Sequence, residues 1–312
     1  MKTKLVEALD KVETIICHAN CADGIASAII LHQVFPNAAV KFIQYSTKEH
    51  QELEATPGMI FCDFSPHRER VDEFVKAGAI VLDHHRTQKE VVEKFGELGF
   101  YADEWDEPGV SGAVLAYRHI WSKRYIHAHV IGRFAELAGV RDTWQKQSSL
   151  WDEAQVQSAM LTFFPVEDLL EDKQFFATLE KRMKVGEVVL AKKKETTERV
   201  TRDAYFASTK EGITYAIVPT LETSDVAEAI DSSRADFLIG FAYRTELGTA
   251  PKLILSMRSR SNYDVSKLCQ AYGGGGHTKA AGCSVTVVPY DLHPYGQIQK
   301  LVQSYEDGEA PF

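Results

Sequence analysis

The sequence has 312 residues, of which 45% are hydrophobic and 25% charged, and its formal net charge is −9. This length accommodates two domains of roughly 100 to 200 residues each, and the composition is typical of a globular protein. Proteins that coat long nucleic acid depend on many Lys and Arg contacts to phosphates, so the acidic balance disfavours that role. A small anionic substrate is compatible with the charge if local cations bind it.

No apolar run approaches the ~20 residues needed to cross a membrane, and residues 1–18 lack the apolar core of a signal peptide. We therefore expect a cytoplasmic protein without a membrane partner. The cysteines are odd in number and form no CxxC pair, which indicates neither a disulfide framework nor a zinc knuckle and fits a reducing compartment. They are Cys17, Cys21, Cys62, Cys269 and Cys283.

Four short apolar segments within the first 85 residues have the length of buried strands, and the stretches between them show helical spacing of apolar residues. This alternation predicts an α/β domain with a doubly wound, mostly parallel sheet. In such sheets ligands bind outside the carboxyl ends of the strands. The predicted strands are residues 12–18, 39–45, 58–64 and 78–85.

Asp and His residues follow three of these four strands, at the rim where the carboxyl ends meet. The second strand ends at Tyr45 and brings no comparable group. A helix cap or a strand-end hydrogen bond would explain each residue alone, but their convergence on one rim favours a shared chemical role. The residues are His18, Asp23, Asp63, Asp83, His84 and His85.

Asp142 closes a helical region predicted over residues 111–144 and joins this set. A mixture of carboxylate and imidazole suits manganese, magnesium or iron more than zinc. Clustered carboxylates raise one another's pKa values unless a cation lies among them. A divalent cation lowers the pKa of bound water and polarises a phosphoryl oxygen, so the residue types predict metal-dependent phosphoryl chemistry.

A second α/β region follows a long helical stretch. Residues 150–203 show helical spacing, and we interpret the charged run Lys192–Lys194 as a solvated helix face rather than a phosphate site. Apolar segments further along the chain predict the strands of a smaller α/β domain. These strands are residues 212–219, 236–244 and 252–260.

Residues 271–282 read AYGGGGHTKAAG. Consecutive glycines let the backbone approach a ligand closely and turn several N–H groups toward an anion, although a flexible loop is the alternative interpretation. The stretch that begins at His277 predicts a helix start, whose dipole also favours an anion. Upstream, Arg258 and Arg260 are candidate phosphate partners.

Six motifs in this order resemble the DHH phosphoesterases, a family named for the triplet at residues 83–85. The first part of the chain resembles the catalytic domain through HANCADGIAS, DFSP, LDHHRT and VRDTW, and the last part resembles the DHH-associated domain through SMRSR and GGGGHTKAAG. The resemblance covers nearly the whole chain. It implies a catalytic metal-binding domain over residues 1–185, a helical linker over 186–205 and a substrate-binding domain over 206–312.

The resemblance also implies the roles of individual residues. His85 is expected to face the substrate phosphate, Asp83 to orient a neighbouring histidine, and Asp63 to bridge two ions. The implied metal ligands are His18, Asp23, Asp63, His84 and Asp142, and the implied substrate-binding residues are Asn20, Arg258, Gly274, Gly275, Gly276 and His277.

The first motif departs from the family pattern, which has two Asp residues two positions apart. Here only Asp23 is present, Cys21 occupies the position of the earlier acid, and Asn20 precedes it. Either one metal site is built differently, with Asn20 or Cys21, or only one ion is tightly held.

The resemblance implies a manganese-dependent phosphodiesterase, with Mg²⁺ or another divalent metal as alternatives and one or two ions. We expect it to hydrolyse short oligonucleotides or linear dinucleotides to mononucleotides with metal-activated water. A phosphomonoesterase acting on phosphoadenosine phosphate and a cyclic nucleotide phosphodiesterase are alternatives on the same scaffold. A catalytically impaired nucleotide-binding regulatory module is an alternative of another class. The family resemblance is also compatible with a homodimer.

Overall fold

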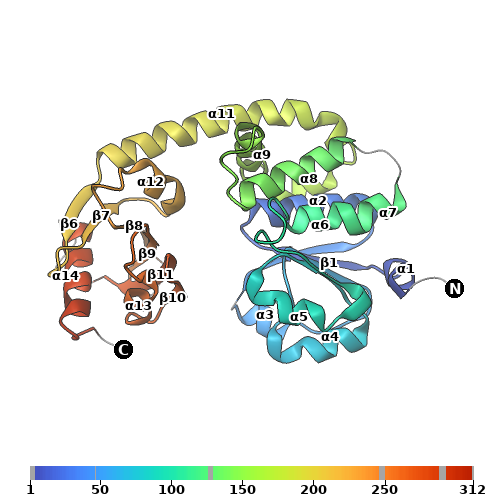
Figure 1. Ribbon diagram of the computed structural model, residues 1–312, viewed down its shortest axis with the longest axis horizontal. Helices are drawn as coiled ribbons and strands as arrows, with labels where there is room; N and C mark the ends of the chain where they lie inside the picture. The colour runs from blue at the N-terminus through green and yellow to red at the C-terminus, as the bar shows by residue number, and fades with distance from the viewer. Residues whose placement is uncertain (1–3, 46, 126–128, 246–249, 288–292, 311–312) are drawn as a thin grey trace. The chain divides into compact units, whose positions relative to one another are not determined.

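The computed structural model describes residues 4–45, 47–125, 129–245, 250–287 and 293–310, with the side chain of His277 left out. The chain divides into two compact units, Met1–Ala191 and Lys192–Phe312 (Figure 1). Each unit has its own sheet and its own buried core. The roles assigned to the predicted domains, catalytic and substrate-binding, stay predictions.

Unit 1 is built around a five-stranded parallel sheet with the strand order β2-β1-β3-β4-β5. Every residue of β3 and β4 is buried, as expected for central strands that are covered on both faces. The four predicted strands are present, and β5 is an addition that was too short to give an apolar pattern. The strands are β1 (Thr14–His18), β2 (Ala39–Ile43), β3 (Met59–Cys62), β4 (Ile80–Asp83) and β5 (Gly99–Tyr101).

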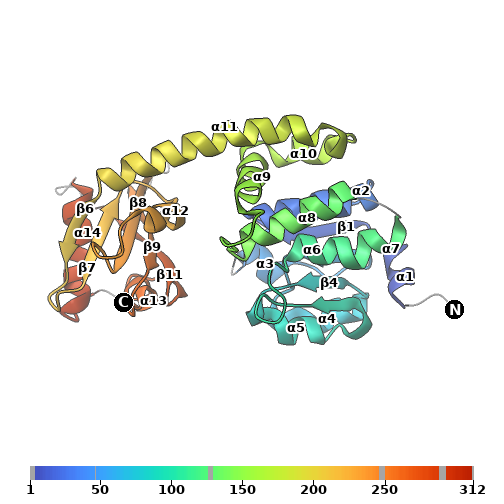
Figure 2. The same ribbon diagram turned by 45° about the horizontal axis from the view of Figure 1, so that its top comes forward.

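Helices cover both faces of this sheet, with α2, α6 and α8 on one face and α3, α4 and α5 on the other (Figures 1 and 2). The predicted doubly wound α/β fold is thereby confirmed. Most of α2 is buried because the sheet, α6 and α8 all pack against it. The helices are α1 (Lys4–Leu9), α2 (Ala22–Val34), α3 (Lys48–Glu52), α4 (Val71–Ala77), α5 (Lys89–Glu93), α6 (Gly112–Ala116), α7 (Ser122–Arg124) and α8 (His129–Asp142), with 3₁₀ turns η1 (Arg68–Arg70), η2 (Arg86–Gln88) and η3 (Gly96–Leu98) and the π-helical turn η4 (Tyr117–Trp121).

The predicted helical stretch of residues 150–203 is present as three helices, α9 (Trp151–Phe163), α10 (Val166–Glu171) and α11 (Phe175–Arg202). Among the helices of the described ranges, none combines the length and the apolar character that a membrane crossing requires.

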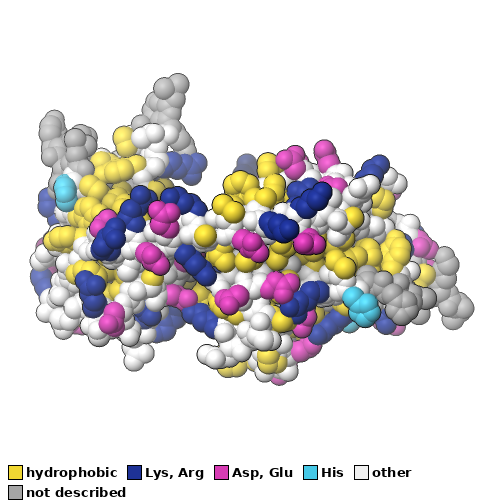
Figure 3. All heavy atoms as spheres, turned by 90° about the horizontal axis from the view of Figure 1, so that it is seen from above, with side chains coloured by type: hydrophobic (Ala, Val, Ile, Leu, Met, Phe, Trp, Pro, Cys, Tyr) yellow, Lys and Arg dark blue, Asp and Glu magenta, His cyan; other side chains and the backbone are white. Residues whose placement is uncertain are grey.

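Charged side chains of both signs lie along the surface of α11. Figure 3 looks onto this helix and shows Lys and Arg side chains interspersed with Asp and Glu. Lys192 pairs with Glu195 at 2.8 Å, and Lys193 pairs with Asp225 at 2.7 Å. These ion pairs fit the interpretation of the basic run as a solvated helix face.

Unit 2 contains a six-stranded mixed sheet with the order β10-β11-β9-β8-β7-β6, in which β7 and β8 are parallel. Alternate residues of β7 enter two different clusters, since Ile217 packs with Ile298 of α14 and Val218 packs with Val226 of α12. The expected smaller α/β domain is confirmed. Its elements are β6 (Tyr205–Ser208), β7 (Thr214–Val218), α12 (Thr223–Ala229), β8 (Phe237–Arg244), β9 (Lys252–Ser259), α13 (Val265–Gln270), β10 (Gly275–His277), β11 (Ala280–Thr286) and α14 (Pro294–Glu306).

The stretch after the glycine run is a hairpin, so the predicted helix start at His277 is wrong. β10 pairs antiparallel with β11, and β11 pairs along its length with β9. Gly276 has a φ of 140°, and a Cβ there would lie 2.5 Å from the carbonyl oxygen of Ala280. Strand pairing with β9 therefore outweighs the local helix propensity of the Ala-containing segment.

Two glycines allow helices to approach the strand ends of unit 1 closely. A Cβ at Gly24 of α2 would lie 2.2 Å from the carbonyl oxygen of His18, and a Cβ at Gly112 of α6 would lie 2.4 Å from Cβ of Asp63. The first turns of α2 and α6 are thus placed directly against the carboxyl ends of β1 and β3.

We expect Gly112→Ala to lower the free energy of unfolding by about 1–3 kcal/mol, because the added methyl group overlaps Asp63 in a packed region. Chemical denaturation of the purified variant measures this change. Gly275→Ala is the matched control, since a Cβ at Gly275 meets nothing within 4 Å. Equal stability of the two variants would contradict the close approach of α6 to Asp63.

Candidate metal centre

The predicted metal ligands of unit 1 all lie around the carboxyl ends of the central strands. His18 is the last residue of β1, Asp63 directly follows β3, and His84 directly follows β4. Asp23 lies in the first turn of α2, and Asp142 is the last residue of α8. The parallel sheet therefore brings together residues that are more than 100 positions apart in the sequence.

Asp63 is at the centre of this group. Its side chain is buried, with Oδ1 3.0 Å from Nε2 of His84 and Oδ2 3.7 Å from Nδ1 of His18. Its backbone has a φ of 57°, in the left-handed region that Asp tolerates better than most residues. The amide of Asp63 donates to the carbonyl of Leu82 at 3.0 Å, which extends the pairing of β3 with β4 and helps to hold this conformation.

His84 connects Asp63 to two further carboxylates. Its Nε2 lies 3.4 Å from Oδ2 of Asp142 and 4.0 Å from Oδ2 of Asp23. Three acids from different elements thus surround one imidazole nitrogen.

Asp23 has a second set of contacts that the sequence did not reveal. Its carboxylate accepts hydrogen bonds from the hydroxyl of Ser111 at 2.7 Å and from the amides of Gly112 and Ala113 at 2.7 and 3.2 Å. These amides belong to the first turn of α6, where a carboxylate is stabilised by unpaired N–H groups. Asp23 therefore also joins α2 to α6.

His85 and Asp83 form a separate pair beside this group. Nδ1 of His85 lies 2.7 Å from Oδ1 of Asp83, and Asp83 also accepts hydrogen bonds from the hydroxyls of Tyr45 at 3.0 Å and Ser65 at 2.5 Å. Asp83 is completely buried, and the side chain of His85 is 31% exposed. Asp83 thus engages Nδ1 of a partly exposed His85 ring, and the roles expected for the two residues stay predictions.

The second strand contributes more than the sequence predicted. Tyr45 and Gln44 follow β2, and both contact site residues: Tyr45 donates to Asp83, and Oε1 of Gln44 lies 2.8 Å from Nε2 of His18. This strand end brings no Asp or His, as expected, but Tyr45 and Gln44 supply two supporting contacts. Their position at the rim was visible in the sequence, but a phenol and an amide are not metal-binding types, so their supporting role was missed.

Two buried atoms indicate that a cation fits this site. Nδ1 of His18 and Oδ2 of Asp63 have no hydrogen-bond partner among the described residues, although both are buried. Each such atom costs roughly 1–3 kcal/mol when it is left unpaired. A cation between them would satisfy both, and Gln44 fixes the tautomer of His18 that leaves Nδ1 available.

The site contains three overlapping groups of three side chains. Within each group, the candidate ligand atoms lie within 4.8 Å of one another. Asp63 belongs to two of these groups and His84 to two. The groups are His18, Cys21 and Asp63; Asp63, His84 and His85; and Asp23, His84 and Asp142. The donor atoms are carboxylate oxygens and imidazole nitrogens with one thiol, a set that suits manganese-type ions.

Cys21 is thus placed with His18 and Asp63, and its Sγ lies 3.9 Å from Oδ1 of Asp142. Asn20 lies in the turn between β1 and α2 and has a φ of 58°. Of the two residues left open by the sequence, Cys21 is therefore the one that the structure groups with candidate ligands.

The carboxyl groups have pKa values that reflect their crowding. Burial raises the pKa of Asp23 well above its usual range, and the charge of Asp63 raises it further. Burial likewise raises the pKa of Asp142. For Asp63 burial also acts upward, but the nearby imidazoles of His18 and His84 outweigh it and lower the pKa. A cation would relieve the repulsion among these three acids.

The histidines respond to the same acids. Burial lowers the pKa of His84, but its hydrogen bond with Asp63 and the charge of Asp142 outweigh this effect and raise the pKa to about 10. For His85 burial is outweighed in the same way by Asp83, and the pKa rises to about 9. Metal binding to His84 must therefore displace a proton.

The predicted substrate-binding residues of the second region are described within unit 2 by themselves. Arg258 is half-buried and donates from Nε to the hydroxyl of Ser224 at 3.1 Å and from Nη1 to the carbonyl of Met257 at 2.9 Å. A Cβ at Gly274 would lie 2.2 Å from the carbonyl oxygen of Gly282. The side chain of His277 lies outside the described part of the structure. A role in substrate binding stays a prediction for these residues.

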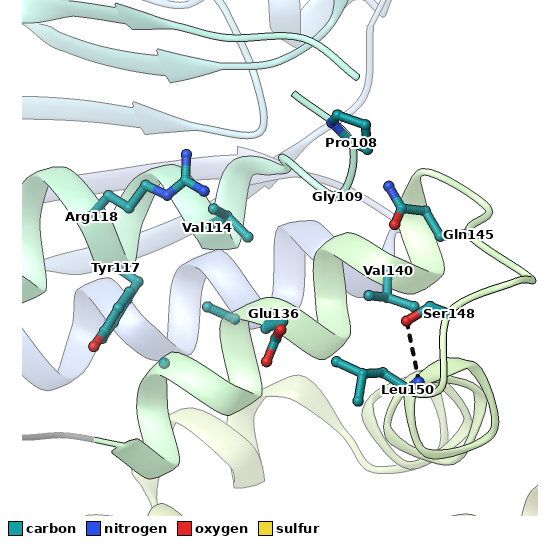
Figure 4. A pocket seen from close by; sticks show the side chains of 12 residues that line it. Pro108, Gly109, Val114, Tyr117, Arg118, Glu136, Val140, Gln145, Ser148 and Leu150 are labelled. Atoms are coloured by element: carbon teal, nitrogen blue, oxygen red, sulfur yellow. Dashed lines mark hydrogen bonds between the residues drawn. The ribbon is translucent and has the colours of Figure 1, made fainter. Parts of the chain in front are cut away.

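A pocket of about 420 Å³ lies between α6 and α8 (Figure 4). None of the candidate metal ligands lines it, and its cation Arg118 is paired with Glu107. This pocket is therefore distinct from the candidate metal centre. Its lining is Pro108, Gly109, Val114, Tyr117, Arg118, Gly132, Ala135, Glu136, Val140, Gln145, Ser148 and Leu150.

The chain is similar in sequence to the oligoribonuclease NrnB of Bacillus subtilis. The two are 26% identical over 267 residues, which cover 80% of this chain and 65% of the relative. The chain thus spans 65% of the length of the curated relative that it matches. No protein-family model matches the chain.

Three solved structures are similar in fold. The exonuclease RecJ bound to manganese has a TM-score of 0.53 at 14% identity over 97% of this chain and 92% of that one. The DHH domain of a member of the S1p family of ribosomal proteins also has a TM-score of 0.53, at 12% identity over 98% and 88% of the two chains. RecJ from Thermus thermophilus in complex with Mn²⁺ has a TM-score of 0.51 at 15% identity over 97% and 53%.

These structures show that the chain has the fold of DHH-domain proteins. The resemblance to the DHH family that the motifs predicted is confirmed, by the fold and by the sequence similarity to NrnB.

We expect Cys21→Asp to tighten Mn²⁺ binding by about 10-fold and to weaken binding of the softer Cd²⁺, because a carboxylate replaces a thiol beside His18 and Asp63. Titration calorimetry with each ion on chelator-treated protein measures both changes. Cys283→Ser in unit 2 is the control. Unchanged ion preference in the Cys21 variant would show that this thiol is not a ligand.

The raised pKa of His85 predicts a pH-dependent contribution to stability. A histidine whose folded pKa is about 9 stabilises the chelator-treated protein fully below pH ~6.5, and this contribution is lost as the pH rises through about 9. The difference in Tm between the wild type and His85→Gln should therefore shrink over that window.

His119 provides the control, because burial lowers its pKa. Its contribution to stability is complete above pH ~6.5 and is lost as the pH falls through its folded pKa, so the Tm difference for His119→Gln should stay constant over the window in which that of His85→Gln shrinks. A His85→Gln difference that is constant from pH 6 to 9.5 would rule out the ion pair with Asp83.

Proposed function

We propose that the chain is a divalent-metal-dependent phosphodiesterase that hydrolyses short oligonucleotides or linear dinucleotides to mononucleotides. The observation that carries this proposal is the position of Asp63, whose carboxylate belongs to two groups of candidate ligands at the carboxyl rim of the sheet. His18, Asp23, Asp63, His84 and Asp142 would hold the metal, with Cys21 as an additional ligand beside His18.

A divalent cation held there lowers the pKa of a bound water and polarises a phosphoryl oxygen. The protein residues supply the positioning. Asp63 is fixed by burial and by the end of β3, and His18 is oriented by Gln44. Such fixed ligands are aligned before the substrate arrives, which is the main condition for electrostatic stabilisation of a phosphoryl transition state.

His85 is the residue that we assign to the substrate phosphate. Asp83 holds its Nδ1 and favours the protonated ring, so Nε2 can donate a hydrogen bond to a phosphate oxygen. Tyr45 and Ser65 satisfy the second oxygen of Asp83. Asp83 thus acts through His85 rather than by touching the substrate.

The length of the substrate is inferred from two considerations. The relative NrnB is an oligoribonuclease, although it is longer than this chain. The net charge of −9 favours short substrates, because long single strands are bound by extended basic tracks. Manganese is the ion that we propose, since the donor atoms suit it and the similar structure of RecJ is bound to manganese.

A nucleotide-binding module without catalysis is the second candidate function. The observation that favours it is Asp23, whose oxygens are engaged by the first turn of α6 while Cys21 stands in place of the second acid. The two candidates differ in turnover and not in nucleotide binding.

A panel of phosphodiesters graded from a dinucleotide to a pentanucleotide, assayed with Mn²⁺, tests the proposal. We expect hydrolysis of the short substrates, which is lost with a chelator and restored by Mn²⁺. Asp63→Asn and His84→Ala should each lower kcat/KM by more than about 100-fold, because each removes a ligand shared by two groups.

Asp172→Asn is the matched control. Asp172 forms an ion pair with Arg182, with an N–O distance of 2.8 Å, and this pair is not at the rim. Its kcat/KM should stay near that of the wild type. Nucleotide binding without turnover of any phosphoester would favour the module, and normal activity of Asp63→Asn would refute the site assignment.

A further inference from the structure

A pocket of about 470 Å³ opens at the carboxyl ends of β4 and β5 in unit 1. Asp83 at the end of β4 pairs in register with Tyr101 at the end of β5, and Arg86 of the pocket directly follows His85, so the pocket lies on the same rim as the candidate metal centre. Its walls come from the segment directly after His85 and from the loop after β5. The lining residues are Arg68, Arg86, Thr87, Lys89, Glu90, Asp103, Trp105 and Asp106.

Trp105 is unusually accessible for a tryptophan, with 73% of its surface exposed. It does not lie on a loose loop, because Asp103 anchors this turn. Asp103 accepts hydrogen bonds from the hydroxyl of Tyr101 at 2.5 Å and from the amide of Trp105 at 3.0 Å. A large aromatic ring is therefore held in place in contact with solvent, where it can stack on a ligand ring.

Two cations of the pocket contact aromatic rings. The guanidinium of Arg86 lies 5.2 Å from the ring centroid of Trp105, and Nζ of Lys89 lies 5.5 Å from that of Tyr101. Among the described residues, neither cation forms an ion pair with a carboxylate. Arg68 differs from them, since it pairs with Glu90 at 3.2 Å. Arg86 and Lys89 can therefore bind an anion without first breaking an ion pair.

The acids of the pocket limit what can bind. Glu90 is paired with Arg68, Asp103 holds its own loop, and Asp106 is exposed. With three cations and three acids in the lining, the formal charges cancel. Net attraction for an extended polyanion is small. Binding must instead come from stacking on a ring and from directed hydrogen bonds to a phosphate, a combination that suits one or two nucleotides.

We propose that this pocket is a nucleotide subsite for the part of a short oligonucleotide beyond the scissile phosphodiester. A base stacks on the exposed face of Trp105, and Arg86 and Lys89 bind the adjoining phosphate. The proposal rests on the phosphodiesterase function proposed above, since it assigns the pocket to the substrate of that site. The proposal also explains why an exposed tryptophan is fixed in the loop after β5, two strands from β3 in the sheet.

The test compares two substrates with Mn²⁺. One is a pentanucleotide, and the other is the p-nitrophenyl ester of a mononucleotide, which has a scissile diester but no further nucleotide. The measured quantity is the kcat/KM for the pentanucleotide divided by the kcat/KM for the ester. In Trp105→Ala this ratio should fall about 10-fold because one base loses its stacking partner. The change should appear as a higher KM for the pentanucleotide. Arg86→Gln/Lys89→Gln should also lower the dependence of log KM on log salt by about 1.

Tyr125→Ala and Lys184→Ala are matched controls, because Tyr125 is 44% exposed and the Lys184 side chain 70% exposed, both outside the pocket. The substrate ratio should not change in either control. An unchanged ratio in Trp105→Ala, with folding verified by circular dichroism, would overturn the subsite.

A binding experiment separates this proposal from the proposed function. Fluorescence anisotropy measures the Kd of a labelled pentanucleotide for the wild type and for Trp105→Ala. If the wild type cleaves neither substrate but Trp105→Ala still weakens binding about 10-fold, the phosphodiesterase function fails and the pocket stands as a nucleotide site. If the pentanucleotide binds both proteins equally, the subsite fails whatever the activity.

Discussion

The structure depends on one buried carboxylate held between two imidazoles. Asp63 lies at the end of β3 with His18 and His84 on either side, and its backbone is in the left-handed region. Desolvating this charge is expensive unless positive charge compensates it. The surrounding fold supplies that compensation: the parallel strands aim both histidines at Asp63, and Gly112 lets α6 approach it closely. The positions of the two histidines and of the first turn of α6 are thus tied to the burial of this one charge.

The sequence predicted the parts of the molecule that depend on local pattern. The four buried strands before residue 85 are apolar runs of the right length, and their polar ends mark the rim. The metal-type residues could be found because several Asp and His residues follow buried strands and converge on one rim, although each alone has an ordinary explanation. The sequence also left Cys21 open as a ligand, and its grouping with His18 and Asp63 depends on the turn after β1.

The parts that the sequence missed depend on partners distant in the chain. Tyr45 and Gln44 have no metal-binding chemistry of their own, and their contacts with Asp83 and His18 appear only once β2 lies beside β1. The contacts of Asp23 with α6 join residues about 90 positions apart. The segment after the glycine run was predicted as a helix start from its local sequence. The strand pairing with β9 that decides its structure is a contact with a distant part of the chain.

The bonds between Asp23 and the first turn of α6 have a consequence for the dynamics of unit 1. The same carboxylate is a candidate ligand and the acceptor for the amides of Gly112 and Ala113. Any ion that orders Asp23 will also hold these two amides closed, and local opening of α6 will disturb the ion. Hydrogen exchange at the start of α6 is therefore a reporter of site occupancy, readable without any substrate.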